Sequence, residues 1–239
     1  MAFVKDADID PTPLAGKKVA IVGYGNQGRA QALNLHDSKV DVVVGLRGGS
    51  GSRFEAEAAG LETALLEDAV AAADVVMMLA PDEIHAALYA EIEPHLRHGA
   101  ALGFSHGLSV RFGFIEPRSD LDVYLLAPKG PGTALRSLYT NGKGMIALWA
   151  VEQDATGNAK GIALAYGRAI GCGRAGLIES SFAEEAEAAA LRVALIEDAV
   201  AQADVVMLLA PDEIHGALYR EIEPHLRHAA ALALLGPKA

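Results

Sequence analysis

Three glycines near the amino terminus have the spacing of a phosphate-binding turn. Gly23, Gly25 and Gly28 form the pattern G-x-G-x-x-G, directly after the apolar run VAIV and before a helical run. The first glycine permits a tight turn, the second lets a pyrophosphate approach the backbone, and the third lets helix and strand pack closely. Free N–H groups at the start of the helix attract anions. The pattern predicts a dinucleotide site; the alternative is a strand-to-helix turn without a ligand.

The end of the next expected strand indicates which dinucleotide is bound. NAD sites usually carry an acid there, about 20 residues past the glycines, for the ribose 2′-hydroxyl. This chain instead reads GLRGGSGSR, with Arg47, Ser50, Ser52 and Arg53. A guanidinium can donate two parallel hydrogen bonds to a phosphate. The loop therefore favours NADPH over NADH, the alternative being a solvated basic loop.

Short apolar strands alternate with amphipathic helices through residues 1–181, which is typical of a parallel sheet covered on both faces. We therefore predict an α/β fold, a doubly wound Rossmann-type sheet with the cofactor at the carboxyl ends of its strands. Asn158 is the expected cap of its last helix. Strands are expected at 18–22, 40–46, 74–80, 100–104 and 122–128, and helices at 26–38, 65–73, 81–92 and 158–171.

Residues 182–239 contain a duplicated α/β half-unit. Residues 191–232 repeat residues 61–102, with 8 differences over 42 positions. The repeated piece is one helix, strand, helix and strand, and it lacks the glycine turn. Its apolar strands are expected to extend a sheet edge or to pair with another chain, which would give a homo-oligomer through this segment.

Composition narrows the class of protein. The formal net charge of −11 argues against nucleic acid and anionic membranes as partners. No apolar run reaches the roughly 18 residues that span a bilayer, and no signal peptide is recognisable, so the expected location is the cytoplasm. Cys172 is the only cysteine, which excludes an intrachain disulfide and predicts a buried, structural thiol.

Further motifs make residues 1–187 resemble a known family. FSHGL is one of the matching runs, and APKGPG with DATGNAK is far more specific than the glycine turn. With it, they look like the N-terminal NADPH-binding domain of ketol-acid reductoisomerase, also called acetohydroxy acid isomeroreductase. The resemblance implies an enzyme that uses NADPH and two Mg²⁺ to isomerise and reduce acetolactate or acetohydroxybutyrate, in valine and isoleucine synthesis. The expected partner is therefore a small 2-keto or acetohydroxy acid.

The resemblance also implies roles for individual residues. His106 would be the active-site histidine, and Lys129 its polar partner beside the metals; from position alone, both could be ordinary loop residues. Arg47, Ser50 and Ser52 would hold the 2′-phosphate. The other implied cofactor contacts are Gly23, Tyr24, Gly25, Asn26, Gln27, Gly28, Asp82, Glu83, Ile84, His85 and Gly132.

The chain departs from the family at the metal site. The family carries Asp and Glu four residues apart on a helix after the run SSF, where one face can bind Mg²⁺. Here Ala189 and Val193 stand at those positions, and neither can bind a metal. The acids of FAEEAE are expected to form a solvated helix face. Because the duplicate also stands where the family has a helical C-terminal domain, we expect impaired isomerisation; the alternative is an NADPH-binding pseudoenzyme or interaction module.

Overall fold

The computed structural model describes residues 3–187, 205–208, 219–220, 223–226 and 231–234. The chain divides into two compact units, Met1–Ala188 and Ala189–Ala239. Within the first unit, the short helix α8 (Phe182–Glu187) contacts helix α5 (Leu108–Arg111) and the sheet. Among the described residues, no helix is long and apolar enough to cross a bilayer.

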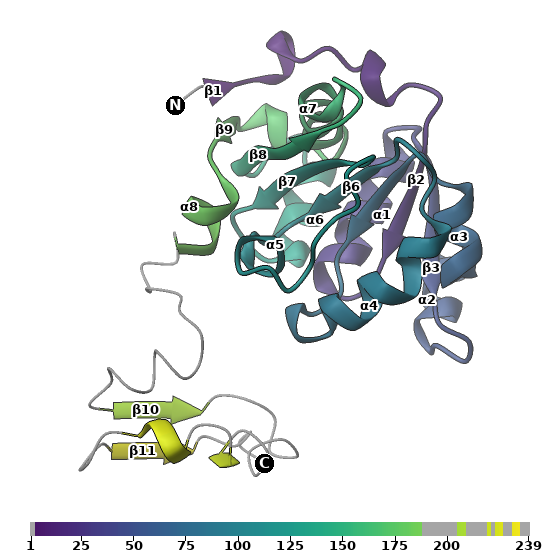
Figure 1. Ribbon diagram of the computed structural model, residues 1–239. Helices are drawn as coiled ribbons and strands as arrows, with labels where there is room; N and C mark the ends of the chain where they lie inside the picture. Colours follow the sequence, from purple (N-terminus) through teal and green to yellow (C-terminus); the bar gives the residue numbers. More distant parts are fainter. Residues whose placement is uncertain (1–2, 188–204, 209–218, 221–222, 227–230, 235–239) are drawn as a thin grey trace. The chain divides into compact units, whose positions relative to one another are not determined.

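A nine-stranded sheet forms the centre of the first unit, in the order β1-β9-β8-β7-β6-β5-β2-β3-β4 (Figure 1). The strands from β4 to β7 run parallel, in the order typical of doubly wound dinucleotide-binding folds. This arrangement confirms the predicted fold class. The strands are β1 (Phe3–Val4), β2 (Lys18–Val22), β3 (Asp41–Leu46), β4 (Glu62–Leu65), β5 (Val75–Met78), β6 (Ala101–Phe104), β7 (Asp122–Pro128), β8 (Ala147–Asp154) and β9 (Leu177–Glu179).

One edge of the sheet is mixed. Strand β8 runs antiparallel to β7, β9 runs parallel to β8, and β1 runs antiparallel to β9. The sequence pattern had predicted neither this edge nor its directions. An apolar run indicates a buried strand, but it does not say in which direction the strand enters the sheet.

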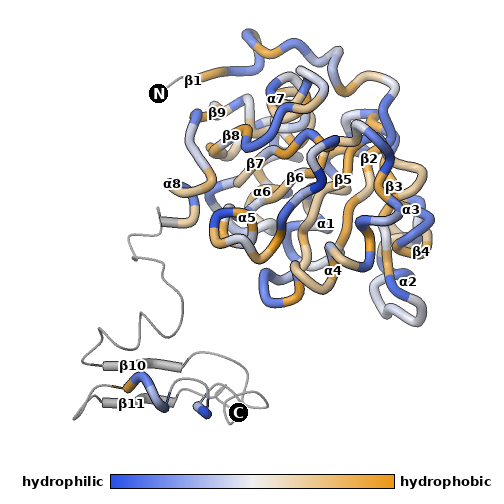
Figure 2. The backbone as a smooth tube through the Cα atoms, viewed as in Figure 1, coloured by the Kyte–Doolittle hydropathy of each residue, from blue (hydrophilic) through white to orange (hydrophobic). Residues whose placement is uncertain are grey.

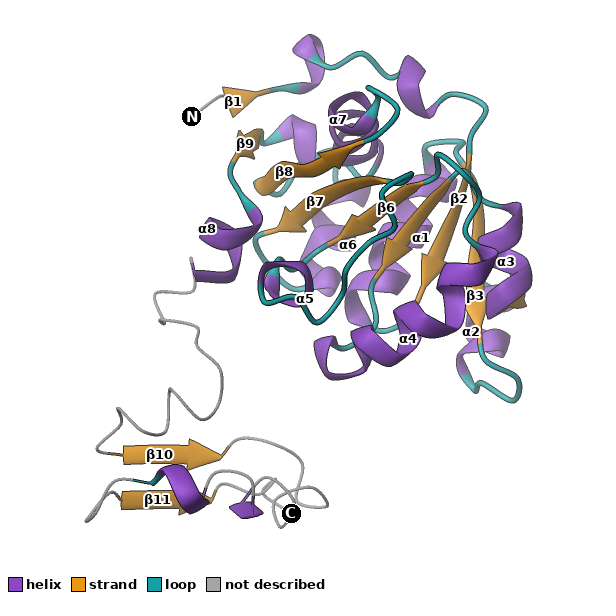
Figure 3. Ribbon diagram, in the orientation of Figure 1, coloured by secondary structure: helices purple, strands orange, loops and turns teal. Residues whose placement is uncertain are grey.

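Helices lie on both faces of the sheet (Figure 3), and the strands between them are mainly hydrophobic (Figure 2). The side chains of each strand alternate between two apolar layers. In β2, Val19 and Ile21 pack on one side, while Ala20 and Val22 pack on the other. The first layer includes residues of α1 (Asn26–Asp37), α2 (Ser52–Ala58), α6 (Gly132–Thr140) and α7 (Ala159–Ala169). The second includes residues of α3 (Leu66–Ala72), α4 (His85–Ile92) and α8.

The start of α7 differs from the prediction. Asn158 does precede the helix, but its side chain makes no capping bond and donates instead to Thr156. The carboxylate of Asp154 accepts the hydrogen bond from the Ala159 N–H at 3.0 Å. Asn158 thus occupies the predicted N-cap position, but the acid at the end of β8 satisfies the donor that its side chain would have capped.

Cys172 is fully buried, as predicted. Burial raises the pKa of its thiol to about 12, because the thiolate would lose its hydration. At neutral pH the thiol is therefore protonated, and it fills the core rather than serving as a nucleophile.

The duplicated segment in the second unit repeats the strand pairing of β5 and β6 in the first unit. Strands β10 (Val205–Leu208) and β11 (Ala231–Leu234) are parallel, and Val205 faces Ala231 as Val75 faces Ala101. The strand pairs of the two copies are not identical in sequence. The copy has Ala233 where the original has Gly103, and a Cβ at Gly103 would overlap the buried ring of Tyr124.

Candidate functional site

The three glycines of the turn meet the requirements predicted for them. Gly23 has a φ of +99°, and a Cβ there would lie 2.8 Å from the backbone nitrogen of Ala80. A Cβ at Gly28 would overlap the carbonyl oxygen of Gly23. At Gly25 a Cβ would meet nothing within 4 Å, so the backbone there is open to a ligand. The turn is closed on its inner side and accessible on its outer side.

A cleft of about 540 Å³ lies over this turn. It lies at the carboxyl ends of β2 and β3, the position predicted for a dinucleotide. Its walls also include several leucines, among them Leu46 and Leu66, which offer an apolar surface to an adenine ring. The predicted cofactor residues that line it are Gly23, Tyr24, Gly25, Asn26, Gln27, Arg47, Ser50, Ser52 and Ile84.

The basic loop after β3 lines the same cleft as the glycine turn. Arg47, Ser50 and Ser52 all line it, and Ser52 is the first residue of α2. The Arg47 side chain is 57% exposed, and its Nη2 lies 2.5 Å from Oε2 of Glu91 on α4. A cation, two hydroxyls and open backbone thus converge on one space, which fits a phosphorylated dinucleotide.

Two side chains at the start of α1 are occupied in holding the turn to the loop after β7. Oδ1 of Asn26 accepts the Thr133 N–H at 2.9 Å, and Nε2 of Gln27 donates to the Gly130 carbonyl at 2.8 Å. A Cβ at Gly132 would overlap the Asn26 carbonyl, so this glycine lets the two helix starts touch. Gly132 lies against Asn26 and is not among the residues that line the cleft.

The segment Asp82–His85 borders the cleft only through Ile84. His85 is only 2% exposed and faces the interior. Its Nδ1 lies 3.0 Å from Oγ of Ser109, and its Nε2 lies 2.8 Å from the Ala80 carbonyl. Asp82 faces two histidines rather than the cleft, and Glu83 is exposed. The structure therefore does not bring these three residues to the cofactor space.

His106 and Lys129 lie in neighbouring loops, after β6 and β7, and one buried carboxylate joins those loops. Oε1 of Glu185 lies 2.7 Å from Nζ of Lys129, and Oε2 accepts the Gly107 N–H at 2.7 Å. His106 is 40% exposed, and its Nδ1 lies 3.4 Å from Asp82. The Glu185 side chain is only 4% exposed, so the prediction that it belongs to a solvated helix face is wrong.

The structure describes only part of the helix on which the family's magnesium ligands are expected. Ala189 and Val193 lie outside the described residues. Glu185 accepts hydrogen bonds from Lys129 and from the Gly107 N–H, and Glu184 accepts one from Ser180. Within the described parts of the chain, no three acidic, histidine or cysteine side chains are grouped to hold a metal ion.

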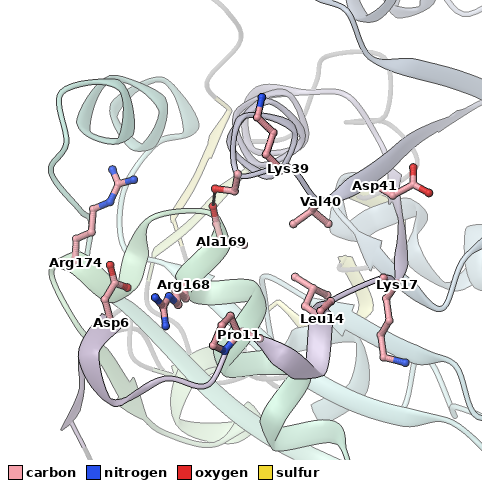
Figure 4. Close-up of a pocket in the computed structure, with 14 residues that line it drawn as sticks. Asp6, Pro11, Leu14, Lys17, Lys39, Val40, Asp41, Arg168, Ala169 and Arg174 are labelled. Carbon is pink, nitrogen blue, oxygen red and sulfur yellow. Dashed lines mark hydrogen bonds between the residues drawn. The ribbon is translucent and has the colours of Figure 1, made fainter.

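A second hollow, of about 660 Å³, lies at the amino ends of β2 and β3 (Figure 4). Lys17 and Lys39 at its rim point away from each other. The guanidinium of Arg168 donates to the Ile9 carbonyl, and that of Arg174 donates to the carbonyls of Tyr139 and Lys143. Its cations therefore do not converge on a shared ligand position.

Comparison with known proteins agrees with this geometry. The family of the acetohydroxy acid isomeroreductase NADPH-binding domain matches residues 13–176 and, again, residues 178–235. The chain belongs to the ketol-acid reductoisomerase family. The second match covers the duplicated segment, so both copies carry the family pattern. As a member of this family, the first unit is an NAD(P)-binding domain.

Solved structures show the same fold. An NADH-preferring ketol-acid reductoisomerase from an uncultured archean is 40% identical, with a TM-score of 0.77. The match covers 80% of this chain and 59% of the solved enzyme. The present chain therefore spans less than two thirds of that enzyme's length. A semialdehyde dehydrogenase NAD-binding protein from Cupriavidus necator is 23% identical, with a TM-score of 0.61 over 72% of this chain and 66% of that chain. This second likeness is one of fold.

Proposed function

We propose that the chain is an NADPH-dependent oxidoreductase of the ketol-acid reductoisomerase type, acting on a small 2-keto or acetohydroxy acid. One observation carries the proposal. The glycine turn and Arg47 share one cleft, while His106 and Lys129 follow β6 and β7, farther along the same edge of the sheet. Such a sheet edge is where α/β enzymes hold a dinucleotide and its substrate together.

The preference for NADPH over NADH rests on Arg47. We expect the substitution Arg47→Gln to weaken NADPH binding about ten- to hundredfold, because charge-assisted hydrogen bonds to a phosphate contribute about 1.5–3 kcal/mol. NADH has no 2′-phosphate, so its affinity should change less than about twofold. Titration of nicotinamide fluorescence measures both constants. Arg53→Gln is the matched control, since Arg53 donates to Thr63 and does not line the cleft.

The described residues offer a reduction step. The glycine turn and Arg47 would hold NADPH, which when bound would supply a hydride to a carbonyl carbon. Lys129 follows β7, and His106 follows β6, so both lie at the edge where the substrate would be held. The Lys129 ammonium can donate a hydrogen bond to the carbonyl oxygen and stabilise the alkoxide as it forms. His106 can carry the proton that the alkoxide finally takes up.

The isomerisation step has less support from the chain. Migration of an alkyl group is the step that most needs metal ions, which polarise the carbonyl. Ala189 and Val193 replace the carboxylates that the family uses there. We therefore propose that this chain retains more of the reduction activity than of the isomerisation activity. The same replacements favour a second candidate, an NADPH-binding pseudoenzyme or interaction module.

An assay of the two half-reactions separates these candidates. We expect slow, chelator-insensitive oxidation of NADPH with an already isomerised 3-hydroxy-2-keto acid. With acetolactate and Mg²⁺, we expect a rate at least about a hundredfold lower than for an enzyme with intact metal carboxylates, since each 1.4 kcal/mol is tenfold. NADPH binding without any oxidation would identify the pseudoenzyme. Chelator-sensitive turnover of acetolactate would contradict the impairment.

A further inference from the structure

Arg47, in the basic loop after β3, forms an ion pair that the sequence does not reveal. Oε2 of Glu91 lies 2.5 Å from Nη2 of Arg47, although the two residues are 44 positions apart. Glu91 lies near the end of α4, and the same helix contributes Leu88 to the wall of the cleft. The carboxylate therefore contacts the cation that the phosphate would use.

The pair leaves the guanidinium able to bind a phosphate. The contact with Glu91 uses Nη2 alone, whereas a guanidinium has five N–H donors. The Arg47 side chain is 57% exposed and the Glu91 side chain 32% exposed. A 2′-phosphate bound to Arg47 would thus lie close to a second negative charge. Like charges at such a distance repel each other.

We propose that Glu91 is a specificity-determining residue, which lowers the preference for NADPH over NADH by placing a carboxylate beside the 2′-phosphate site. The inference rests on the proposed role of Arg47. The ribose hydroxyl of NADH carries no charge, so the repulsion acts on NADPH alone. Glu91 thereby opposes the effect of Arg47 on cofactor preference.

The substitution Glu91→Gln tests this idea with little change of shape. The amide can still accept a hydrogen bond from Arg47, but it carries no charge. We expect NADPH to bind about three- to fivefold more tightly, the range of a partly exposed charge pair. The dissociation constant of NADH should stay the same. If Glu91 only oriented Arg47, NADPH affinity would stay the same or fall, which would overturn the inference.

A double-mutant cycle distinguishes this inference from the proposal on which it rests. In the Arg47→Gln background, Glu91→Gln should no longer raise NADPH affinity as it does in the wild type. If Arg47→Gln itself leaves NADPH affinity unchanged, the assignment of the 2′-phosphate loop fails. If Arg47→Gln weakens NADPH but Glu91→Gln does not strengthen it, only the role of Glu91 fails. Glu93→Gln serves as the control, because this nearby acid lies by Arg118 and Tyr89.

Discussion

Substitution of Gly28 by alanine should strongly weaken NADPH binding and destabilise the first unit. The new Cβ would overlap the carbonyl oxygen of Gly23, which belongs to the same turn and cannot rotate away. Forcing a methyl group into a packed site costs about 1–3 kcal/mol, and a backbone obstacle places this case at the upper end. Because the turn must shift, we expect NADPH affinity to fall at least about a hundredfold.

Gly25→Ala provides the matched comparison. Gly25 has a φ of −76°, which alanine adopts readily, and its Cβ would meet nothing within 4 Å. The lower entropy of the unfolded chain offsets the weaker helix cap, so stability should change by less than about 0.5 kcal/mol. The methyl group would nevertheless stand where the pyrophosphate approaches, and NADPH affinity should fall about tenfold.

Urea unfolding followed by tryptophan fluorescence measures the stability of these variants. Trp149 is the only tryptophan and is buried in the first unit, so its signal reports on the unfolding of that unit. If Gly28→Ala and Gly25→Ala lost stability equally, the close packing of the turn would not be the cause. If Gly25→Ala bound NADPH normally, the pyrophosphate would not lie over Gly25.

The features that sequence predicted well are local in the chain. Gly23, Gly25 and Gly28 act within six residues, and the alternation of strand and helix depends on short periodic runs. For the same reason, the continuous apolar run of β2 correctly predicted a strand buried on both faces.

The features that sequence did not predict depend on pairs of residues distant in the chain. Glu185 and Lys129 are 56 positions apart, and Glu91 and Arg47 are 44 apart. A glutamate in an acidic run normally indicates a solvated surface, so nothing local marked Glu185 as buried. His85 was likewise expected at the cofactor, yet Ser109 and the Ala80 carbonyl hold it in the interior.

The substitution Lys129→Met should destabilise the first unit, because it leaves the carboxylate of Glu185 buried without its cation. Removing one partner of a buried pair costs about 3–5 kcal/mol, and Lys129 is itself 38% exposed, so we expect about 2–3 kcal/mol. The Gly107 N–H continues to donate to Glu185 and limits the loss. NADPH affinity should change little, since Lys129 does not line the cleft.

The double variant Lys129→Met with Glu185→Gln separates the structural role of this lysine from its chemical role. Without the buried charge, most of the stability should return, because the glutamine carbonyl can still accept the Gly107 N–H. Reduction of the 2-keto acid should remain at least about a hundredfold slower, as no ammonium stabilises the alkoxide. Recovery of both properties would show that Lys129 serves only to neutralise Glu185, and the substrate carbonyl would then depend on His106 alone.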